Sequence, residues 1–347
     1  MTAIAFILIF LAIVLVHEWG HFYVARKCGM RVLEFGFGLP PRIASKQGKN
    51  TLYSLNALPI GGFVRIAGEN GLEDDVPKEE QFESKKWYAK SAVLVAGVVC
   101  NVLLGFILFF AAYVSGIPVI TPDGTPTIVS ITDGFPAQQA GLQINDTVTG
   151  IRALDGTPIK LTTEAVHTFL TTHDEPITLE ITRSGTAQTI TITPKEENGS
   201  RMIGVAIESI ATSDASFINA LNYAGSQSIG TLSLIFVTLK SLLIGLFSHQ
   251  PSAEGLVGPV GLVKIVGEAT KIGIGYVLAL AAAISINLAA VNILPFPALD
   301  GGRLLIVLLE ALTGRTFSKK TAAIIHSAGF IILIGLMIFL TIKDIRG

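Results

Sequence analysis

The feature that most constrains this chain is an apolar segment near its start that contains three ionisable side chains. The apolar run from Ala3 to Val16 leads directly into His17-Glu18-Trp19-Gly20-His21, and Phe22 to Ala25 then continue the apolar segment. A bilayer core about 30 Å thick needs about 20 apolar residues, so this segment has the length of a membrane-spanning helix. Ionisable groups at that depth are costly, and the segment therefore predicts a functional site inside the membrane.

The spacing His-Glu-x-x-His favours a particular chemistry on a helix. Positions i and i+4 share one face, so His17 and His21 can direct ring nitrogens at a single Zn²⁺. Glu18 lies beside them, where a carboxylate can take a proton from water. A chance match is disfavoured because apolar flanks would exclude these side chains unless something held them. A cleaved secretory segment is disfavoured because a basic start and an A-x-A-like site are missing before the motif.

The composition is that of a membrane protein. Half of the residues are apolar and only 15% are charged, against roughly 25% charged in an average globular chain. The net charge of -1 gives no reason to expect nucleic acid as a partner. Two cysteines, Cys28 and Cys100, are too few for a disulfide scaffold and complete no metal-binding cluster.

Hydropathy predicts a polytopic α-helical membrane protein with four spans, at residues 3–25, 91–115, 275–297 and 321–342. A fifth apolar segment, 217–247, is interrupted by polar residues. Lys and Arg crowd the chain between the first two spans and again at 303–320, which places both stretches in the cytoplasm by the positive-inside rule. Residues 116–274 must then lie outside, and an odd number of crossings must separate them from 303–320. One crossing, at 275–297, is enough, so 217–247 is expected to be an amphipathic helix that lies on or dips into the membrane surface.

The part of the chain from 117 to 207 has the pattern of a small α+β domain. Thr, Ile and Val alternate in Thr127–Ile131 and again in Ile177–Ile192, with a turn at Ser184-Gly185 and a helix-like stretch at Thr163–Leu170. The run Gly134–Asp146 resembles the PDZ pattern of a short helix, a Gly turn and an Asp before a strand. PDZ domains add a peptide strand to a sheet edge, which implies substrate selection or gating. A folded spacer that binds nothing is the alternative.

A catalytic zinc site needs a third protein ligand, and Asp300 is the best candidate. Pro295 and Pro297 must interrupt the third span just before it. Irregular backbone at membrane depth is tolerated only where it is buried in protein or lines a wet cavity. Asp300 is thus placed to reach a metal held by the first helix; an N-cap of a helix that starts near Gly301 is the other interpretation.

Together, the two motifs resemble the site-2 protease family of intramembrane zinc metalloproteases, in particular its bacterial RseP branch. The motifs are HEWGH at 17–21 in the first span and NILPFPALDGG at 292–302 in a later one. The resemblance implies that His17, His21 and Asp300 bind zinc and that Glu18 is the general base. It also implies that Asn287 and Asn292 face the site, with Asn292 holding the substrate backbone.

Further matches lie between the first two spans. Gly36-Phe37-Gly38 resembles the family's G-x-G loop, and Leu52–Ala67 resembles its membrane re-entrant β-hairpin. In that hairpin, Gly61, Gly62 and Phe63 would contact the substrate, since an exposed strand edge can pair with an unwound substrate helix. Gly258–Gly261 also fits the family. One departure is that the best-known RseP-type enzymes carry two PDZ domains and this chain has room for one.

These observations predict a zinc metalloendopeptidase of a bacterial cytoplasmic membrane, with its PDZ domain outside. Four parts are expected: 1–115 with the first two spans and hairpin, the PDZ domain at 116–207, the surface helix and linker at 208–257, and the last two spans at 258–347. The resemblance implies single-pass membrane substrates trimmed beforehand by another protease, such as anti-sigma factors, or signal-peptide remnants. A membrane scaffold is a rival, but it would not need Glu18. A metal transporter is another, but it would be expected to show repeated halves.

Overall fold

The computed structural model describes residues 2–69, 73–153, 156–158, 168, 176–197, 200–214, 216–247, 257–315 and 318–346. The chain divides into two compact units. Unit 1 contains 1–115 and 215–347, and unit 2 contains 116–214.

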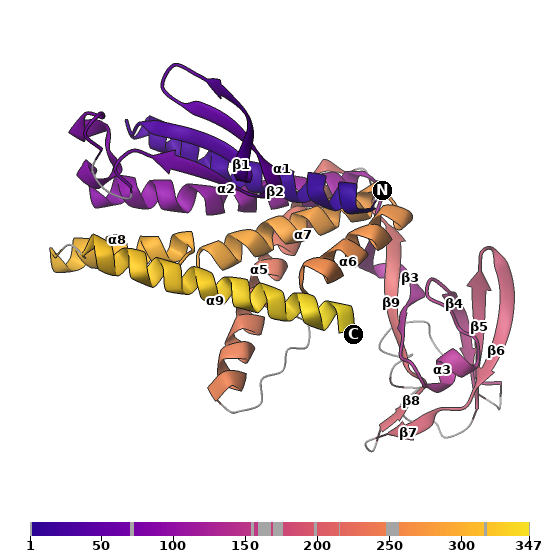
Figure 1. Cartoon of the computed structure of the whole chain (residues 1–347). Coiled ribbons are helices and arrows are strands. Elements are labelled where there is room, and N and C mark those ends of the chain that lie inside the picture. Colours follow the sequence, from indigo (N-terminus) through magenta and orange to yellow (C-terminus); the bar gives the residue numbers. More distant parts are fainter. Residues whose placement is uncertain are drawn as a thin grey trace. The chain divides into compact units, whose positions relative to one another are not determined.

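Unit 1 is built on long apolar helices, with a β-hairpin between the first two (Figure 1). Its helices are α1 (Thr2–Lys27), η1 (Lys78–Glu80), η2 (Phe82–Ser84), α2 (Trp87–Val114), α5 (Phe217–Phe247), α6 (Pro259–Ile272), α7 (Ile274–Asn292), α8 (Asp300–Thr313) and α9 (Lys319–Arg346). Four described helices, α1, α2, α7 and α9, are long and apolar enough to cross a membrane, as predicted. Four such helices are typical of a multi-pass membrane protein. Helix α5 is not one of the four.

The third span is shorter than the sequence suggested. Helix α7 ends at Asn292 instead of continuing to 297. Pro295 and Pro297 lack the N–H group that a helix interior requires, so the chain leaves the helix just before them. It re-enters helical structure at α8, which begins at Asp300.

Helix α2 is the centre of unit 1 and packs against α1, α5, α7 and α8. Close approach depends on its glycines. A Cβ at Gly105 would lie 2.5 Å from Ile286 Cγ1 of α7. On the other side, a Cβ at Gly20 of α1 would lie 2.6 Å from the Ala96 carbonyl oxygen of α2. The glycine within the HEWGH motif therefore lets α1 and α2 touch backbone to backbone.

The hairpin consists of β1 (Val32–Gln47) and β2 (Leu52–Ile66), which pair along most of their length. Residues 34–37 pair on both sides, with 62–65 and with 52–55, so the two long strands fold into a small sheet. The Phe35 ring packs edge-on against Phe22 of α1, with 5.4 Å between ring centroids. The hairpin that was expected at Leu52–Ala67 thus starts earlier, and it rests on the helix that carries His17 and His21.

Unit 2 is a five-stranded sheet with the order β6-β5-β4-β3-β9. Its elements are β3 (Pro118–Ile131), α3 (Pro136–Gln139), β4 (Thr147–Arg152), β5 (Ile177–Arg183), β6 (Thr186–Ile192), β7 (Lys195–Glu197), β8 (Ser200–Met202) and β9 (Val205–Thr212). The predicted strands are present, and Ser184 and Gly185 form the β5–β6 turn with positive φ of 49° and 82°. The helix expected at 163–170 lies outside the described residues except for Thr168. Unit 2 extends past the expected limit of 207 because β9 continues to Thr212.

A buried ion pair fixes the turn before β4 in unit 2. Asp146 is 1% exposed, and its carboxylate accepts hydrogen bonds from Arg183 at 2.7 and 2.8 Å and from the Gln143 N–H at 2.8 Å. Burial by itself raises the pKa of Asp146, but these hydrogen bonds and the charge of Arg183 outweigh it and hold the pKa below its usual value. The Asp that completes the Gly134–Asp146 pattern therefore has a structural role.

Candidate metal centre

Helix α1 places two histidine side chains on one face, against α2. His17 and His21 are 6% and 8% exposed. Their Nε2 atoms lie 3.2 Å apart, because a separation of four residues brings side chains together on a helix. A Cβ at Gly97 of α2 would lie 2.4 Å from His21 Nε2. The two rings are thus packed against the backbone of α2.

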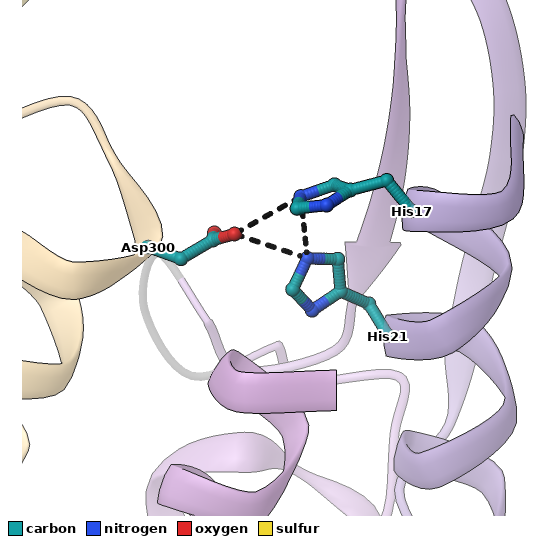
Figure 2. A group of neighbouring side chains, drawn as sticks. All are labelled: His17, His21 and Asp300. Carbon is teal, nitrogen blue, oxygen red and sulfur yellow. Dashed lines mark hydrogen bonds and ion pairs between the residues drawn. The ribbon is translucent and has the colours of Figure 1, made fainter. Parts of the chain in front are cut away.

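Asp300 reaches the two histidines from the other half of unit 1. Its Oδ2 lies 3.0 Å from His17 Nε2 and 3.2 Å from His21 Nε2, and Figure 2 shows all three side chains converging. Asp300 is the first residue of α8, and Leu299, not Asp300, occupies the N-cap position of that helix. The contacts therefore favour the ligand interpretation of Asp300 over the N-cap.

The chain before Asp300 takes a tight path that only small residues permit. Ala298 has a positive φ of 78°, a conformation that costs free energy for a residue with a side chain. A Cβ at Gly301 would lie 2.2 Å from the Ile293 carbonyl oxygen, and one at Gly302 would lie 2.3 Å from that of Phe296. The glycines after Asp300 thus let α8 begin directly against the end of α7.

The three side chains fit a zinc ion. Tetrahedral ligands at 2.0–2.1 Å from Zn²⁺ are about 3.3 Å from one another, and two histidines with one carboxylate are a known catalytic set. The three candidate ligand atoms are 3.0 to 3.2 Å apart. His21 Nδ1 lies 2.7 Å from the Val93 carbonyl oxygen, to which it can donate, and this leaves Nε2 free to bind metal. Donor type, spacing and ring orientation all agree with zinc.

Glu18 lies next to the histidines on α1 and in contact with the hairpin. A Cβ at Gly62 of β2 would lie 2.9 Å from Glu18 Cγ and 3.2 Å from a methyl group of Val14. A side chain at position 62 would therefore push against Glu18. Strand β2 can come this close to the candidate base because residue 62 is a glycine.

Of the two asparagines predicted to face the site, Asn292 lies next to the candidate ligands and Asn287 does not. Asn292 Nδ2 lies 3.3 Å from His17 Nε2, so this amide is at the site. Asn287 is exposed, and its amide donates to the Ala283 carbonyl oxygen at 3.0 Å, away from the three candidate ligands. Gly61 has a positive φ of 81° with open space beside it, and the Phe63 ring covers Gly36.

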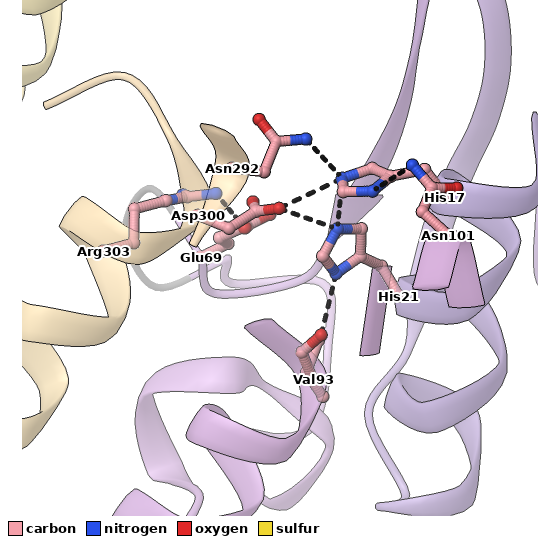
Figure 3. Close-up of polar contacts among 8 residues, drawn as sticks. All are labelled: His17, His21, Glu69, Val93, Asn101, Asn292, Asp300 and Arg303. Atoms are coloured by element: carbon pink, nitrogen blue, oxygen red, sulfur yellow. Dashed lines mark hydrogen bonds and ion pairs between the residues drawn. The ribbon is translucent and has the colours of Figure 1, made fainter. Parts of the chain in front are cut away.

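Two groups on α2 were not anticipated from the sequence. Gly97 makes room for the histidine rings, and Asn101, which is fully buried, places its Nδ2 3.4 Å from His17 Nδ1 (Figure 3). Asn101 could have been identified from the sequence as a single amide side chain within an apolar span, because polar residues inside a membrane are rare and often functional. Gly97 carried no such signal, because its role depends on which helix packs against it.

An ion pair joins the segment after the hairpin to the helix that carries Asp300. Glu69 follows β2, and its carboxylate pairs with Arg303, one turn after Asp300 in α8 (Figure 3). Both side chains line a cavity of about 560 Å³ that also borders Pro297, Ala298 and Gly302. The loop that presents Asp300 is thus held by an ion pair and has open space beside it.

Comparison with known proteins identifies the family. The sequence pattern of Peptidase family M50 matches residues 5–336. A protein of Fusobacterium nucleatum named as a putative zinc metalloprotease is 35% identical over 96% of this chain and 95% of its own length. A protein of Clostridium acetobutylicum with the same description is 30% identical over 98% of this chain and 96% of its own length. Zinc metalloprotease RasP of Shouchella clausii is 28% identical, covering 99% of this chain and 98% of RasP.

These matches decide between the function classes that the sequence left open. They span nearly the whole chain and support neither a scaffold nor a transporter. The family is zinc-dependent, so the cofactor is zinc, and site-2 proteases act on membrane proteins. The chain therefore belongs to Peptidase family M50, the site-2 protease family, and is a multi-pass membrane zinc metalloprotease.

Proposed function

We propose that the chain cleaves peptide bonds of single-pass membrane proteins within or near the bilayer, with His17, His21 and Asp300 as zinc ligands and Glu18 as general base. The observation that carries this proposal is the convergence of the three candidate ligand atoms within 3.2 Å of one another beside Glu18. When bound, zinc supplies a Lewis acid that lowers the pKa of a water molecule and polarises the scissile carbonyl.

The side chains of this site have separate tasks in that reaction. Glu18 takes a proton from the attacking water as the water oxygen bonds to the carbonyl carbon, and it then gives the proton to the leaving amine as the C–N bond breaks. In this proposal Asn292 donates to a backbone carbonyl of the substrate, which is supported by the distance of 3.3 Å between its amide nitrogen and His17 Nε2.

A transmembrane substrate must be unwound before it is cleaved, because a helix protects its own peptide groups. In this proposal the hairpin holds the unwound segment as an added strand, which is supported by the close approach of β2 to Glu18 at Gly62. In this proposal Gly61, Gly62 and Phe63 contact the substrate, and the hairpin dips into the membrane. Anti-sigma factors trimmed beforehand by another protease and signal-peptide remnants are substrates of the expected kind.

We further propose that unit 2 is a PDZ domain on the outer side of a bacterial cytoplasmic membrane, where it selects or gates substrates. The strand order and the turn at Gly134–Asp146 support this assignment. The Lys and Arg residues at 303–320 and between the first two spans face the cytoplasm. Helix α5 then lies on or dips into the membrane surface.

The decisive variant is Glu18→Gln, which keeps the size and polarity of the side chain and removes the base. We expect zinc content to be unchanged and cleavage of a single-pass test substrate to fall by at least ~100-fold, within the range for loss of a general base. Both quantities are measured on the purified full chain. Near-normal cleavage with unchanged zinc would refute the role of Glu18.

A further inference from the structure

The buried side chain of Asn101 faces the ring nitrogen of His17 that points away from the other candidate ligands. Asn101 is 0% exposed, and its Nδ2 lies 3.4 Å from His17 Nδ1 (Figure 3). Its Oδ1 is buried and has no hydrogen-bond partner among the described residues. Burying an amide oxygen without a partner costs free energy, so this oxygen calls for an explanation.

Two contacts of helix α2 lie next to the Asn101 side chain. The hydroxyl of Ser285 in α7, also 0% exposed, donates a hydrogen bond of 2.8 Å to the main-chain carbonyl oxygen of Asn101. A Cβ at Gly97, one turn earlier on α2, would lie 2.9 Å from His17 Nδ1. The imidazole is thus packed against α2, and Asn101 is the polar side chain that α2 brings to Nδ1.

The chemistry of a metal-bound imidazole explains the unpartnered oxygen. His17 Nε2 is the atom that faces His21 and Asp300, so Nε2 gives its lone pair to the metal and Nδ1 must carry the ring proton. That N–H needs an acceptor, and an amide nitrogen cannot accept. Rotating the planar Asn101 amide by 180° exchanges Nδ2 and Oδ1 within nearly the same volume.

We propose that Asn101 is a positioning residue that sets the tautomer of His17 through this rotation. Without metal, His17 Nε2–H donates to Asp300 and Nδ1 accepts from Asn101 Nδ2. With metal, Nδ1–H donates to Asn101 Oδ1. His21 differs, since its Nδ1 faces the fixed Val93 carbonyl at 2.7 Å, and it keeps one tautomer in both states. The inference rests on the proposed function, because His17 has to be a ligand.

Two nearly isosteric variants test the proposal in the full chain. Asn101→Leu removes every acceptor, and zinc affinity, measured by competition with a chelator, should fall by roughly 10–100-fold, as for loss of other outer partners of metal ligands. Asn101→Asp keeps an acceptor in both orientations and should bind zinc at least as tightly as the unmodified chain. A purely structural role for Asn101 predicts the opposite order, because burying a charge costs more than removing an amide.

Ser285→Ala is the matched control, since it removes a buried polar group from the same contact without touching the amide of Asn101. Its zinc affinity should stay within about twofold of the unmodified chain. Normal affinity in Asn101→Leu, equal loss in both Asn101 variants, or equal loss in Ser285→Ala would overturn the proposal. Should Asn101→Leu fail to fold, NMR of the zinc-loaded unmodified chain decides, because the proposal requires the His17 Nδ1–H to be hydrogen-bonded to Asn101 Oδ1. A His17 Nδ1–H without that hydrogen bond would overturn the proposal.

The same assay separates this inference from the one it rests on. If His17→Ala binds zinc as tightly as the unmodified chain, His17 is not a ligand and the proposed function fails in that part. If His17→Ala loses zinc while Asn101→Leu keeps it, only the role of Asn101 is wrong.

Discussion

Replacing Gly97 by alanine should disable the metal centre from a position that makes no bond to metal. The added Cβ would lie 2.4 Å from His21 Nε2 and 2.7 Å from His17 Cε1. Contacts of a Cβ below 3.0 Å essentially never occur, so the distance between the α2 backbone at position 97 and His21 Nε2 must grow by about 0.6 Å. Metal sites tolerate about 0.2 Å in ligand distance. The required displacement is thus about three times what the site can absorb.

The expected result for Gly97→Ala is a loss of zinc affinity of at least ~100-fold, or about 2.8 kcal/mol. That figure is the upper end of the effect seen when an outer partner of a ligand is removed, and here the ligand itself is displaced. Chelator competition on the purified chain measures the affinity, and cleavage of a single-pass test substrate should fall in parallel.

Two glycine variants separate this effect from general overpacking. Gly105→Ala lies on the same helix and meets Ile286 Cγ1 at 2.5 Å, so it should cost about 1–3 kcal/mol of stability and keep zinc. Gly335→Ala in α9 meets nothing within 4 Å and should be neutral. Full zinc affinity in Gly97→Ala, or equal zinc loss in Gly105→Ala, would show that the contact between α2 and the histidines is not what we describe.

Three further predictions concern other parts of the chain. Asp300→Asn should bind well under the one zinc per chain expected of the unmodified protein, and full retention in metal analysis would remove Asp300 from the ligand set. The pKa of Asp146 is lowered in the folded state, so its ion pair stabilises unit 2 above the ordinary Asp pKa of about 4, and this contribution is lost as the pH falls further. Asp146→Asn should therefore destabilise unit 2 by ~2 kcal/mol at pH 7 and by much less at pH 3, measured by urea titration with hydrogen exchange of β4; an equal difference at both pH values would contradict the assigned cause. In a background without the two native cysteines, a membrane-impermeant thiol reagent added outside should label a cysteine at Ser184 but not at Ser318, and the reverse pattern would invert the proposed topology.

The sequence was sufficient wherever the signal is local. The proximity of the His17 and His21 rings could be predicted from their spacing, because four residues make about one turn of a helix. Asp300 could be found because two prolines break an apolar segment just before it. The strands on either side of Ser184-Gly185 follow from alternation and a turn, and all three features are present in the structure.

What depends on packing between distant segments could not be predicted. Nothing local reveals that Gly97 and Asn101 face α1, since the choice of neighbour is tertiary. The double pairing of residues 34–37 likewise depends on how a long hairpin folds on itself. Asn287 illustrates a different limit: five helical residues turn the chain by about 140° relative to Asn292, so the two amides cannot both face the site from one helix.

The most direct test of the central claim is to map where the purified, zinc-loaded chain cuts a single-pass membrane protein. The substrate carries a tag at each end, and mass spectrometry of both products locates the broken bond, with the Glu18→Gln chain as control. The proposed function predicts a cut inside the apolar segment or within a few residues of its end, and no such products from the control. A cut confined to the soluble parts of the substrate, or the same products from both chains, would contradict it.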